Sequence, residues 1–264
     1  MDATPAPRVV LVHDWLTGMR GGEKCLEVLC RRWPSARLFT LLHKPGSVSE
    51  AIEALGPRTS FLGRLPGVHR YYRYLLPLMP AAVSRLRLPP CDLVVSFSHC
   101  VAKSARPPAG APHVCYCFTP MRYAWHLRDA YFAGRVRGPK ARLLGLLLGR
   151  LRDWDRASAS RVSQFVAISQ TVRRRIAECY GRDSTVIYPP VDTDFYRPER
   201  VKREDYYLAV SAFAPYKRLD LALAACAALG RRLGSNQRHA AYEAAALTAE
   251  LRRLAGPRGN PPAL

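Results

Sequence analysis

Short apolar runs, each followed by polar or glycine-rich residues, constrain the fold of this chain more than any other feature. Between them, apolar side chains recur at helical spacing, as in Glu23–Trp33 and Gln170–Tyr180. Continuous apolar runs are typical of strands buried on both faces, and strands that alternate with helices favour a doubly wound parallel sheet. We therefore expect an α/β fold. Six runs are predicted to be strands: Arg8–His13, Leu38–Leu42, Asp92–Phe97, His113–Phe118, Gln164–Ile168 and Thr185–Tyr188.

The composition limits the function classes. The chain has 264 residues, and its hydrophobic fraction of 48% is enough for an ordinary core, which excludes global disorder. The net charge of +21 would attract phosphates, nucleic acid or anionic lipid, although a general arginine bias explains it equally well. No helix-turn-helix, RRM or KH pattern is present, so we expect no nucleic-acid partner.

The cysteines and the N-terminus bear on the compartment. None of the eight cysteines forms a CxxC pair or zinc spacing, so we expect small buried hydrophobes and no metal site. Cys115 and Cys117 alternate in a strand and should face the same side. Met1–Arg8 lacks a signal-peptide pattern, and no apolar run reaches the roughly 20 residues of a membrane span. These features predict a cytoplasmic protein in a reducing compartment.

The pattern changes after the sixth predicted strand. We expect a first Rossmann-like domain over residues 1–188 and a polar, Pro-flanked linker over 189–205. Residues 206–232 would open a second α/β domain, with a strand at Tyr206–Val210 and a helix at Leu219–Leu229. Over 233–264 the apolar pattern disappears, so this part is predicted to be an atypical tail.

Two cations, Lys217 and Arg218, stand between this predicted strand and its helix. The first turn of a helix has free backbone N–H groups that favour an anion. Two positive side chains beside them would hold a diphosphate. The sequence thus predicts a phosphate site at this junction.

Two further candidate sites follow strands of the first domain. Gly21 and Gly22 lie between the first strand and its helix, where backbone N–H groups could approach a ligand, although a plain tight turn fits equally well. The pattern is not GxGxxG, which disfavours a nicotinamide dinucleotide. His99 comes just after the strand Asp92–Phe97, at the crevice of an open sheet, where a structural role is the alternative. His113 and His126 are weaker rivals.

Three stretches resemble one enzyme family. The block from Val210 to Asp220 resembles the nucleotide-sugar diphosphate site of retaining, family-4, GT-B glycosyltransferases. The sequence His-Asp-Trp-Leu, followed by Gly21-Gly22, is similar to the first loop of its bacterial members. The string Tyr-Cys-Phe-Thr-Pro-Met-Arg-Tyr-Ala-Trp, ending at Trp125, resembles a subgroup that builds O-antigen and exopolysaccharide. The resemblance runs from about Arg8 to Arg232.

The resemblance implies a GT-B N-terminal Rossmann-like domain plus the start of a second Rossmann-like domain. It implies transfer of a hexosyl unit, plausibly mannosyl, from a nucleoside-diphosphate sugar to a glycan or lipid-linked glycan in cell-surface polysaccharide synthesis. The donor is a substrate, and neither cofactor nor metal is expected. The implied roles are donor-sugar contact for His99, donor binding for Gly21, Gly22, Lys217 and Arg218, and acceptor-side positions for Asp14, Arg122 and Tyr123.

Two departures from the family pattern qualify this reading. Ala212 stands where many relatives carry an arginine, so Lys217 and Arg218 would have to hold the diphosphate alone. Glu243 and Glu250 are seven residues apart and lack the Pro-Phe-Gly context of the family's donor-binding glutamate pair. A truncated or frame-shifted product without activity is therefore one alternative expectation.

Two basic stretches predict contact with an anionic membrane. Pro57–Pro90 contains six arginines, three tyrosines and no acidic residue. Arg135–Arg152 contains six cations around Leu143–Leu148. A basic amphipathic surface can lie on anionic lipid, here the inner face of the cytoplasmic membrane. In the alternative, the leucines pack into the core. A non-enzymatic membrane-binding module is the other function class that this pattern allows.

Overall fold

A computed structural model describes residues 6–126, 138–198, 206–207, 209–211 and 217–232 of the chain. The chain separates into two compact units. The first contains the described residues up to Tyr196, and the second contains those from Arg197 onward. Each unit is described by itself.

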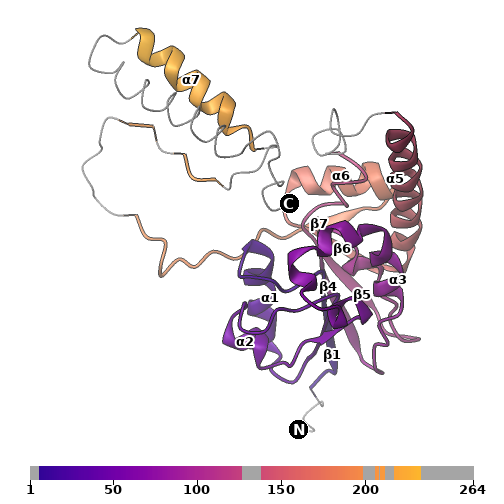
Figure 1. The fold of residues 1–264 in the computed structure, drawn as a ribbon. Coiled ribbons are helices and arrows are strands. Elements are labelled where there is room, and N and C mark those ends of the chain that lie inside the picture. The colour runs from indigo at the N-terminus through magenta and orange to yellow at the C-terminus, as the bar shows by residue number, and fades with distance from the viewer. Residues whose placement is uncertain (1–5, 127–137, 199–205, 208, 212–216, 233–264) are drawn as a thin grey trace. The chain divides into compact units, whose positions relative to one another are not determined.

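The first unit is built on a seven-stranded parallel sheet with the order β3-β2-β1-β4-β5-β6-β7 (Figure 1). This order is that of a doubly wound Rossmann-like sheet, which confirms the predicted fold class. Six strands match the predicted runs to within two residues at each end, and the two-residue strand β3 was missed. The strands are β1 (Val9–His13), β2 (Arg37–Thr40), β3 (Arg58–Thr59), β4 (Leu93–Ser98), β5 (His113–Cys117), β6 (Gln164–Ala167) and β7 (Ser184–Val186).

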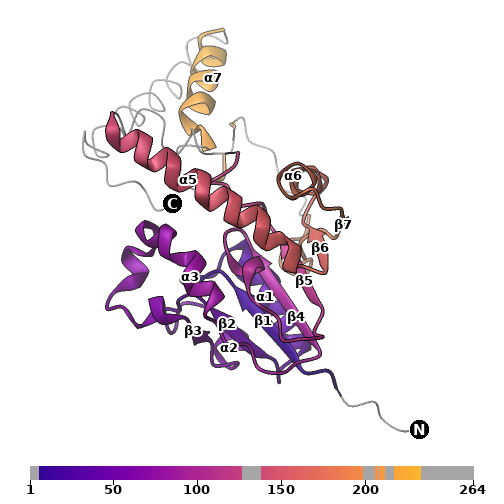
Figure 2. The same cartoon turned by 90° about the vertical axis from the view of Figure 1, so that its right-hand side faces the viewer.

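Helices cover both faces of this sheet. Helices α1 and α2 lie on one face, and α3 and α5 lie on the other, with α5 crossing in front of the sheet in Figure 2. The α-helices of the first unit are α1 (Gly21–Arg32), α2 (Glu50–Glu53), α3 (Met79–Ser84), α5 (Pro139–Ser158) and α6 (Gln170–Tyr180). Short 3-10 helices are η1 (Phe61–Arg64), η2 (Val68–Arg70), η3 (Tyr72–Leu78), η4 (Ala102–Ser104) and η5 (Ala159–Arg161).

Two apolar clusters form the core, one on each face of the sheet. The first joins α1 and α2 to β1, β2 and β4, with Phe97 and Tyr116 on this face. The second joins α6 to β5 and β6 and includes Cys115 and Cys117. Because successive side chains of a strand point to opposite faces, both clusters share β5. The prediction that these two cysteines face the same side is confirmed. All eight cysteines are free thiols, and six are buried.

The end signals of α6 were correctly read from the sequence. The hydroxyl of Ser169 accepts a hydrogen bond from the backbone N–H of Val172 at 3.2 Å, as an N-cap does. Gly181 ends the helix in the left-handed conformation, with φ of 64°. Helix α5 was not predicted as a helix, because its cations and leucines were read only as a basic-aliphatic stretch.

The second unit contains helix α7 (Leu219–Arg232), which begins at the residue predicted for it. The backbone carbonyl of Arg218 accepts from the N–H groups of Leu221 and Ala222 and so starts the helix. No strand is present at the described residues within Tyr206–Val210, where one was expected. A strand needs a neighbour to pair its backbone groups, and the described part of this unit offers none.

No helix among the described residues is both long enough and apolar enough to cross a bilayer.

Candidate active site

The site residues of the first unit gather where β1 and β4 end. These two strands are neighbours in the sheet, yet β1 leads to β2 on one side and β4 leads to β5 on the other. Such a reversal of strand order opens a crevice at the carboxyl ends of the strands, where ligands bind in open α/β sheets. Asp14 directly follows β1, and His99 directly follows β4. The sheet topology therefore brings together two residues that are 85 positions apart in the sequence.

The carboxylate of Asp14 is fully buried and fully engaged within the protein. Its Oδ2 accepts the backbone N–H groups of His99 at 2.7 Å and Cys100 at 2.9 Å. Its Oδ1 accepts those of Val101 and Ala102, each at 2.7 Å. We call residues 99–104 the β4 loop. The resemblance implied an acceptor-side position for Asp14, which stays a prediction; in the structure both of its oxygens accept from the β4 loop.

Asp14 also fixes the imidazole of His99. The distance from His99 Nδ1 to Asp14 Oδ2 is 3.0 Å. A carboxylate only accepts, so Nδ1 carries the proton and Nε2 keeps its lone pair as an acceptor. Burial lowers the pKa of His99, Asp14 partly opposes this, and the nearby guanidinium groups of Arg122 and Arg20 lower it further. The ring is therefore neutral at pH 7, and its side chain is 16% exposed.

The two glycines at the start of α1 differ in their surroundings. A Cβ at Gly21 would meet nothing within 4 Å, so this first residue of the helix is open to a ligand. A Cβ at Gly22 would lie 3.3 Å from the Phe118 ring and 3.4 Å from Nε2 of His13. Gly22 thus lets the helix pack onto these two rings, which is a structural reason for this glycine.

His13 belongs to this cluster and was missed by the sequence reasoning. Its Nδ1 lies 3.0 Å from the backbone carbonyl of Trp15 and must therefore carry the proton. Burial lowers the pKa of His13 to about 4, so the ring is neutral. Its buried Nε2 has no hydrogen-bond partner among the described residues. The signal was available, because His13 opens the His-Asp-Trp-Leu string.

Aromatic and cationic side chains surround His99. The indole of Trp15 meets the His99 ring edge-on at 4.5 Å between centroids. Arg20 is the exposed N-cap residue of α1, and its backbone N–H donates to Glu23 at 3.1 Å. Arg122 is half-buried, and its guanidinium charge lowers the pKa of His99. Tyr123 is only 8% exposed, and its acceptor-side position stays a prediction.

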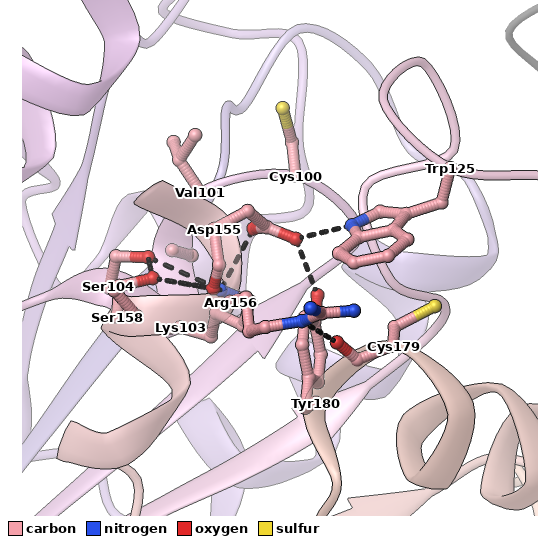
Figure 3. Close-up of polar contacts among 12 residues, drawn as sticks. Cys100, Val101, Lys103, Ser104, Trp125, Asp155, Arg156, Ser158, Cys179 and Tyr180 are labelled. Carbon is pink, nitrogen blue, oxygen red and sulfur yellow. Dashed lines mark hydrogen bonds and ion pairs between the residues drawn. The ribbon is translucent and has the colours of Figure 1, made fainter. Parts of the chain in front are cut away.

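A buried ion pair lies behind the β4 loop (Figure 3). Lys103 Nζ is 2.8 Å from Asp155 Oδ1, and both side chains are at most 1% exposed. The ammonium also donates to the Asp155 carbonyl at 2.8 Å and to Ser158 Oγ at 3.0 Å. The ammonium therefore lies among a carboxylate, a carbonyl and a hydroxyl at the end of α5, where a helix favours a cation. Removing one partner of such a pair typically costs about 3–5 kcal/mol of stability.

The two rival histidines are less suited to the site. His113 begins β5, so it lies at the opposite edge of the sheet from His99, and its Nε2 is 2.8 Å from Ser96 Oγ. His126 is exposed, and its Nε2 is 3.4 Å from Cys179 Sγ. The geometry therefore favours His99 among the candidates that the sequence offered.

Lys217 and Arg218 occupy the predicted place, directly before α7, and both are exposed. The Arg218 guanidinium makes a two-pronged contact with the Asp220 carboxylate, at 3.0 Å and 3.1 Å. Arg218 is therefore already paired. Ala212, Glu243 and Glu250 lie outside the described residues.

An apolar groove of the first unit lies apart from this site. It has a volume of about 430 Å³ and is lined by apolar side chains of α1, β4, β5 and β6 and by residues 187–190. Its lining includes neither His99 nor Arg122 and has no charged group to hold a phosphate. No three His, Cys, Asp or Glu side chains gather as a metal centre within the described ranges.

The sequence profile of Glycosyltransferase Family 4 matches residues 19–195, which is well over half of the chain and includes α1, β4 and the β4 loop. The chain belongs to glycosyltransferase family 4. A search of curated proteins finds no match.

Among solved structures, the chain is similar to HepE from Anabaena, in crystals with UDP and with UDP-glucose. Sequence identity is 14% and 15%, and the TM-score is 0.41 for both. The matches cover 73% of this chain but only 47% and 46% of HepE. The chain thus spans about half the length of the solved structures that it matches.

The buried histidines predict an acid-sensitive fold. Burial lowers the pKa of His13 and of His113 to about 4, below the value of about 6.5 in an unfolded chain. Between these values the unfolded state binds more protons than the native state, so stability falls as the pH falls from 6.5 to 4. Each such histidine contributes a slope of up to about 1.4 kcal/mol per pH unit. The free energy of unfolding, measured by urea titration at several pH values, should depend less steeply on pH in His113→Gln than in wild type. Half-buried His69→Gln is the control. If the free energy of unfolding of His113→Gln depended on pH as steeply as that of wild type, the lowered pKa of His113 would be contradicted.

Proposed function

We propose that this chain forms the acceptor-side half, and the start of the donor-side half, of an enzyme that transfers a hexosyl unit from a nucleoside-diphosphate sugar. The observation that carries the proposal is the place of the His99 imidazole. It is held by Asp14 at the sheet's switch point, beside the open N-terminus of α1. Membership of glycosyltransferase family 4 supports the same reaction class.

The charges around His99 suit a leaving diphosphate. Transfer of a sugar from a nucleotide develops negative charge on the diphosphate oxygen that leaves. The backbone N–H groups in the first turn of α1, together with the guanidinium groups of Arg20 and Arg122, would stabilise that charge. Arg122, expected from the resemblance on the acceptor side, is here proposed to contact the diphosphate. Asp14 and Tyr123, being buried, act behind the contact surface.

His99 acts by accepting a hydrogen bond from a hydroxyl of the donor sugar. Its Nδ1 proton is committed to Asp14, so Nε2 presents a lone pair. A neutral imidazole with a fixed tautomer can orient a hydroxyl but does not need to take its proton. His99 is thus a positioning contact to the substrate.

On the donor side, Lys217 is proposed as the main diphosphate anchor. Arg218, which contacts Asp220 in the structure, is proposed to assist it. An ammonium at the start of α7 adds its charge to that of the helix N-terminus.

The finer assignment is a mannosyl or related hexosyl donor, and a glycan or lipid-linked glycan as acceptor, in cell-surface polysaccharide synthesis. It rests on the Thr119-Pro-Met-Arg122-Tyr-Ala-Trp125 string and its resemblance to that subgroup. In the structure this string follows β5, at the same edge of the sheet as His99. It therefore stands where it could shape the acceptor's approach.

The test is sugar transfer with UDP- and GDP-hexoses and a lipid extract as acceptor. The 264-residue chain is compared with the same chain extended by the remaining donor-domain segment of a family member. We expect transfer by the extended chain. His99→Gln should lose about 10–100-fold of kcat/KM, the value of one hydrogen bond to substrate, and Lys217→Ala about 10²–10³-fold.

His69→Gln and Lys140→Ala are the matched controls, because they remove the same groups away from the site. An extended chain that folds but transfers no hexose would contradict the proposed function. Transfer that is unchanged by His99→Gln would keep the reaction and contradict the role given to His99.

A second candidate, membrane binding, is favoured by one specific observation on α5. Leu143, Leu146 and Leu147 are 58%, 66% and 41% exposed, whereas Leu148 packs into the core. The three exposed leucines and Arg150 follow the i, i+3, i+4, i+7 spacing of one helix face. The alternative in which all these leucines pack inside is therefore wrong. An apolar stripe with cations beside it fits the interface of an anionic bilayer.

Vesicle co-sedimentation tests this surface. Binding should be stronger to anionic than to neutral vesicles and should weaken at high salt. Changing all three leucines to Ser should reduce the partition constant by on the order of 10²-fold, at about 1 kcal/mol for each partly inserted side chain. Leu221→Ser on α7, which is also 58% exposed, is the control. Equal binding to both vesicle types, or no loss in the triple variant, would refute the surface.

A further inference from the structure

We propose that Asp155 is a positioning residue for the active site, because it anchors both the β4 loop that carries His99 and the segment that carries Arg122. It is not in the site itself, and nothing in its sequence context marks it. The inference rests on the proposed function only for the substrate-contacting roles of His99 and Arg122. The anchoring is a property of the fold and can be tested without any assay of sugar transfer.

The Asp155 carboxylate joins three parts of the chain that are far apart in sequence (Figure 3). Its Oδ1 pairs with Lys103 at 2.8 Å. Its Oδ2 accepts from Trp125 Nε1 and from Tyr180 Oη, both at 2.9 Å. The indole ring also meets the Tyr180 ring edge-on at 6.3 Å between centroids. Residues following β4, residues following β5 and the last residue of α6 thus all meet at one carboxylate on α5.

Lys103 connects Asp155 to the β4 loop that carries His99. Ala102, the residue before Lys103, donates its N–H to Asp14. The β4 loop is therefore held at one end by Asp14 and at the other by Asp155, with four backbone N–H groups between. Ser104, the next residue, shares a 2.6 Å hydrogen bond with Ser158 on the same helix. If the end of the β4 loop at Lys103 shifted, the backbone N–H groups of residues 99–102 would also move. These groups hold the Asp14 carboxylate, which in turn holds the His99 ring.

Trp125 connects Asp155 to the turn that carries Arg122. Trp125 and Arg122 belong to one tight turn, in which the backbone N–H groups of Ala124 and Trp125 both donate to the carbonyl of Met121. Fixing the indole therefore fixes the turn from which the Arg122 side chain leaves. The guanidinium of Arg156, one residue after Asp155, lies 5.1 Å from the Trp125 ring centroid and adds to this hold.

The experiment uses the full chain and measures hydrogen exchange of backbone amides and the NMR signal of the His99 Nδ1 proton. In wild type, the amides of residues 99–102 should be protected and the Nδ1 proton should be visible. In Asp155→Asn, we expect exchange at 99–102 to rise by about tenfold or more, with β1 and β4 amides unchanged, and the Nδ1 signal to broaden or move. Asp153→Asn, the same charge change at an exposed position of α5, is the control.

Because Asp155→Asn leaves Lys103 buried and unpaired, it could fail to fold. The double variant Lys103→Met with Asp155→Asn removes both charges together and keeps the shape, and Trp125→Phe removes only the indole donor. The double variant should be stable yet retain the altered His99 signal, and Trp125→Phe should change the chemical shifts of Arg122 but leave exchange at residues 99–102 unchanged. Wild-type exchange at 99–102 and a wild-type His99 signal in a folded double variant would overturn the proposal and leave Asp155 a purely structural residue.

Discussion

The site depends on the hydrogen bonds that the buried Asp14 carboxylate accepts. Four backbone N–H groups and one imidazole N–H converge on two oxygens with no exposure to solvent. Hydrogen bonds to a charged group are worth more than those between neutral groups, and an unpaired buried carboxylate is very costly. The end of β1 and the start of the β4 loop are therefore held as one piece. The same bonds set the tautomer of His99, so stability and chemistry share one cause.

A second buried carboxylate extends this arrangement to the rest of the first unit. Asp155 reaches the β4 loop through Lys103 and the turn after β5 through Trp125. Both site segments are irregular, yet each rests on a buried charge that is itself fixed by a regular element. The exposed face of α5, by contrast, carries leucines and cations that no described residue of the core covers. One helix thus combines an inner face that orders the site with an outer face suited to a membrane.

The sequence predicted the sheet well, because its strands are continuous apolar runs with clear ends, and Ser169 and Gly181 mark α6 directly. It did not predict β3, which has only two residues, or α5, whose leucines divide between a buried and an exposed face. His99 and the glycines were named as candidates because they follow strands. The contacts of Asp14, Lys103 and Asp155 could not be predicted, since each depends on partners at least 25 residues away in the chain. The expected strand at Tyr206–Val210 is absent from its described residues because a strand signal does not supply a pairing partner.

The most direct test of this account is the free energy of unfolding of Asp14→Asn, measured by urea titration at pH 7. The NH2 group of an asparagine here would face backbone N–H groups, so the hydrogen bonds to one of the two oxygens would be lost. The hydrogen bonds to the other oxygen would weaken, because the amide carries no charge. The account predicts a loss of about 3–5 kcal/mol, as for breaking a buried charged network. Asp92→Asn is the control, because Asp92 forms an exposed ion pair with Arg8 that should contribute less than about 1 kcal/mol. A loss in Asp14→Asn no larger than in Asp92→Asn would contradict the claim that this carboxylate holds the site together.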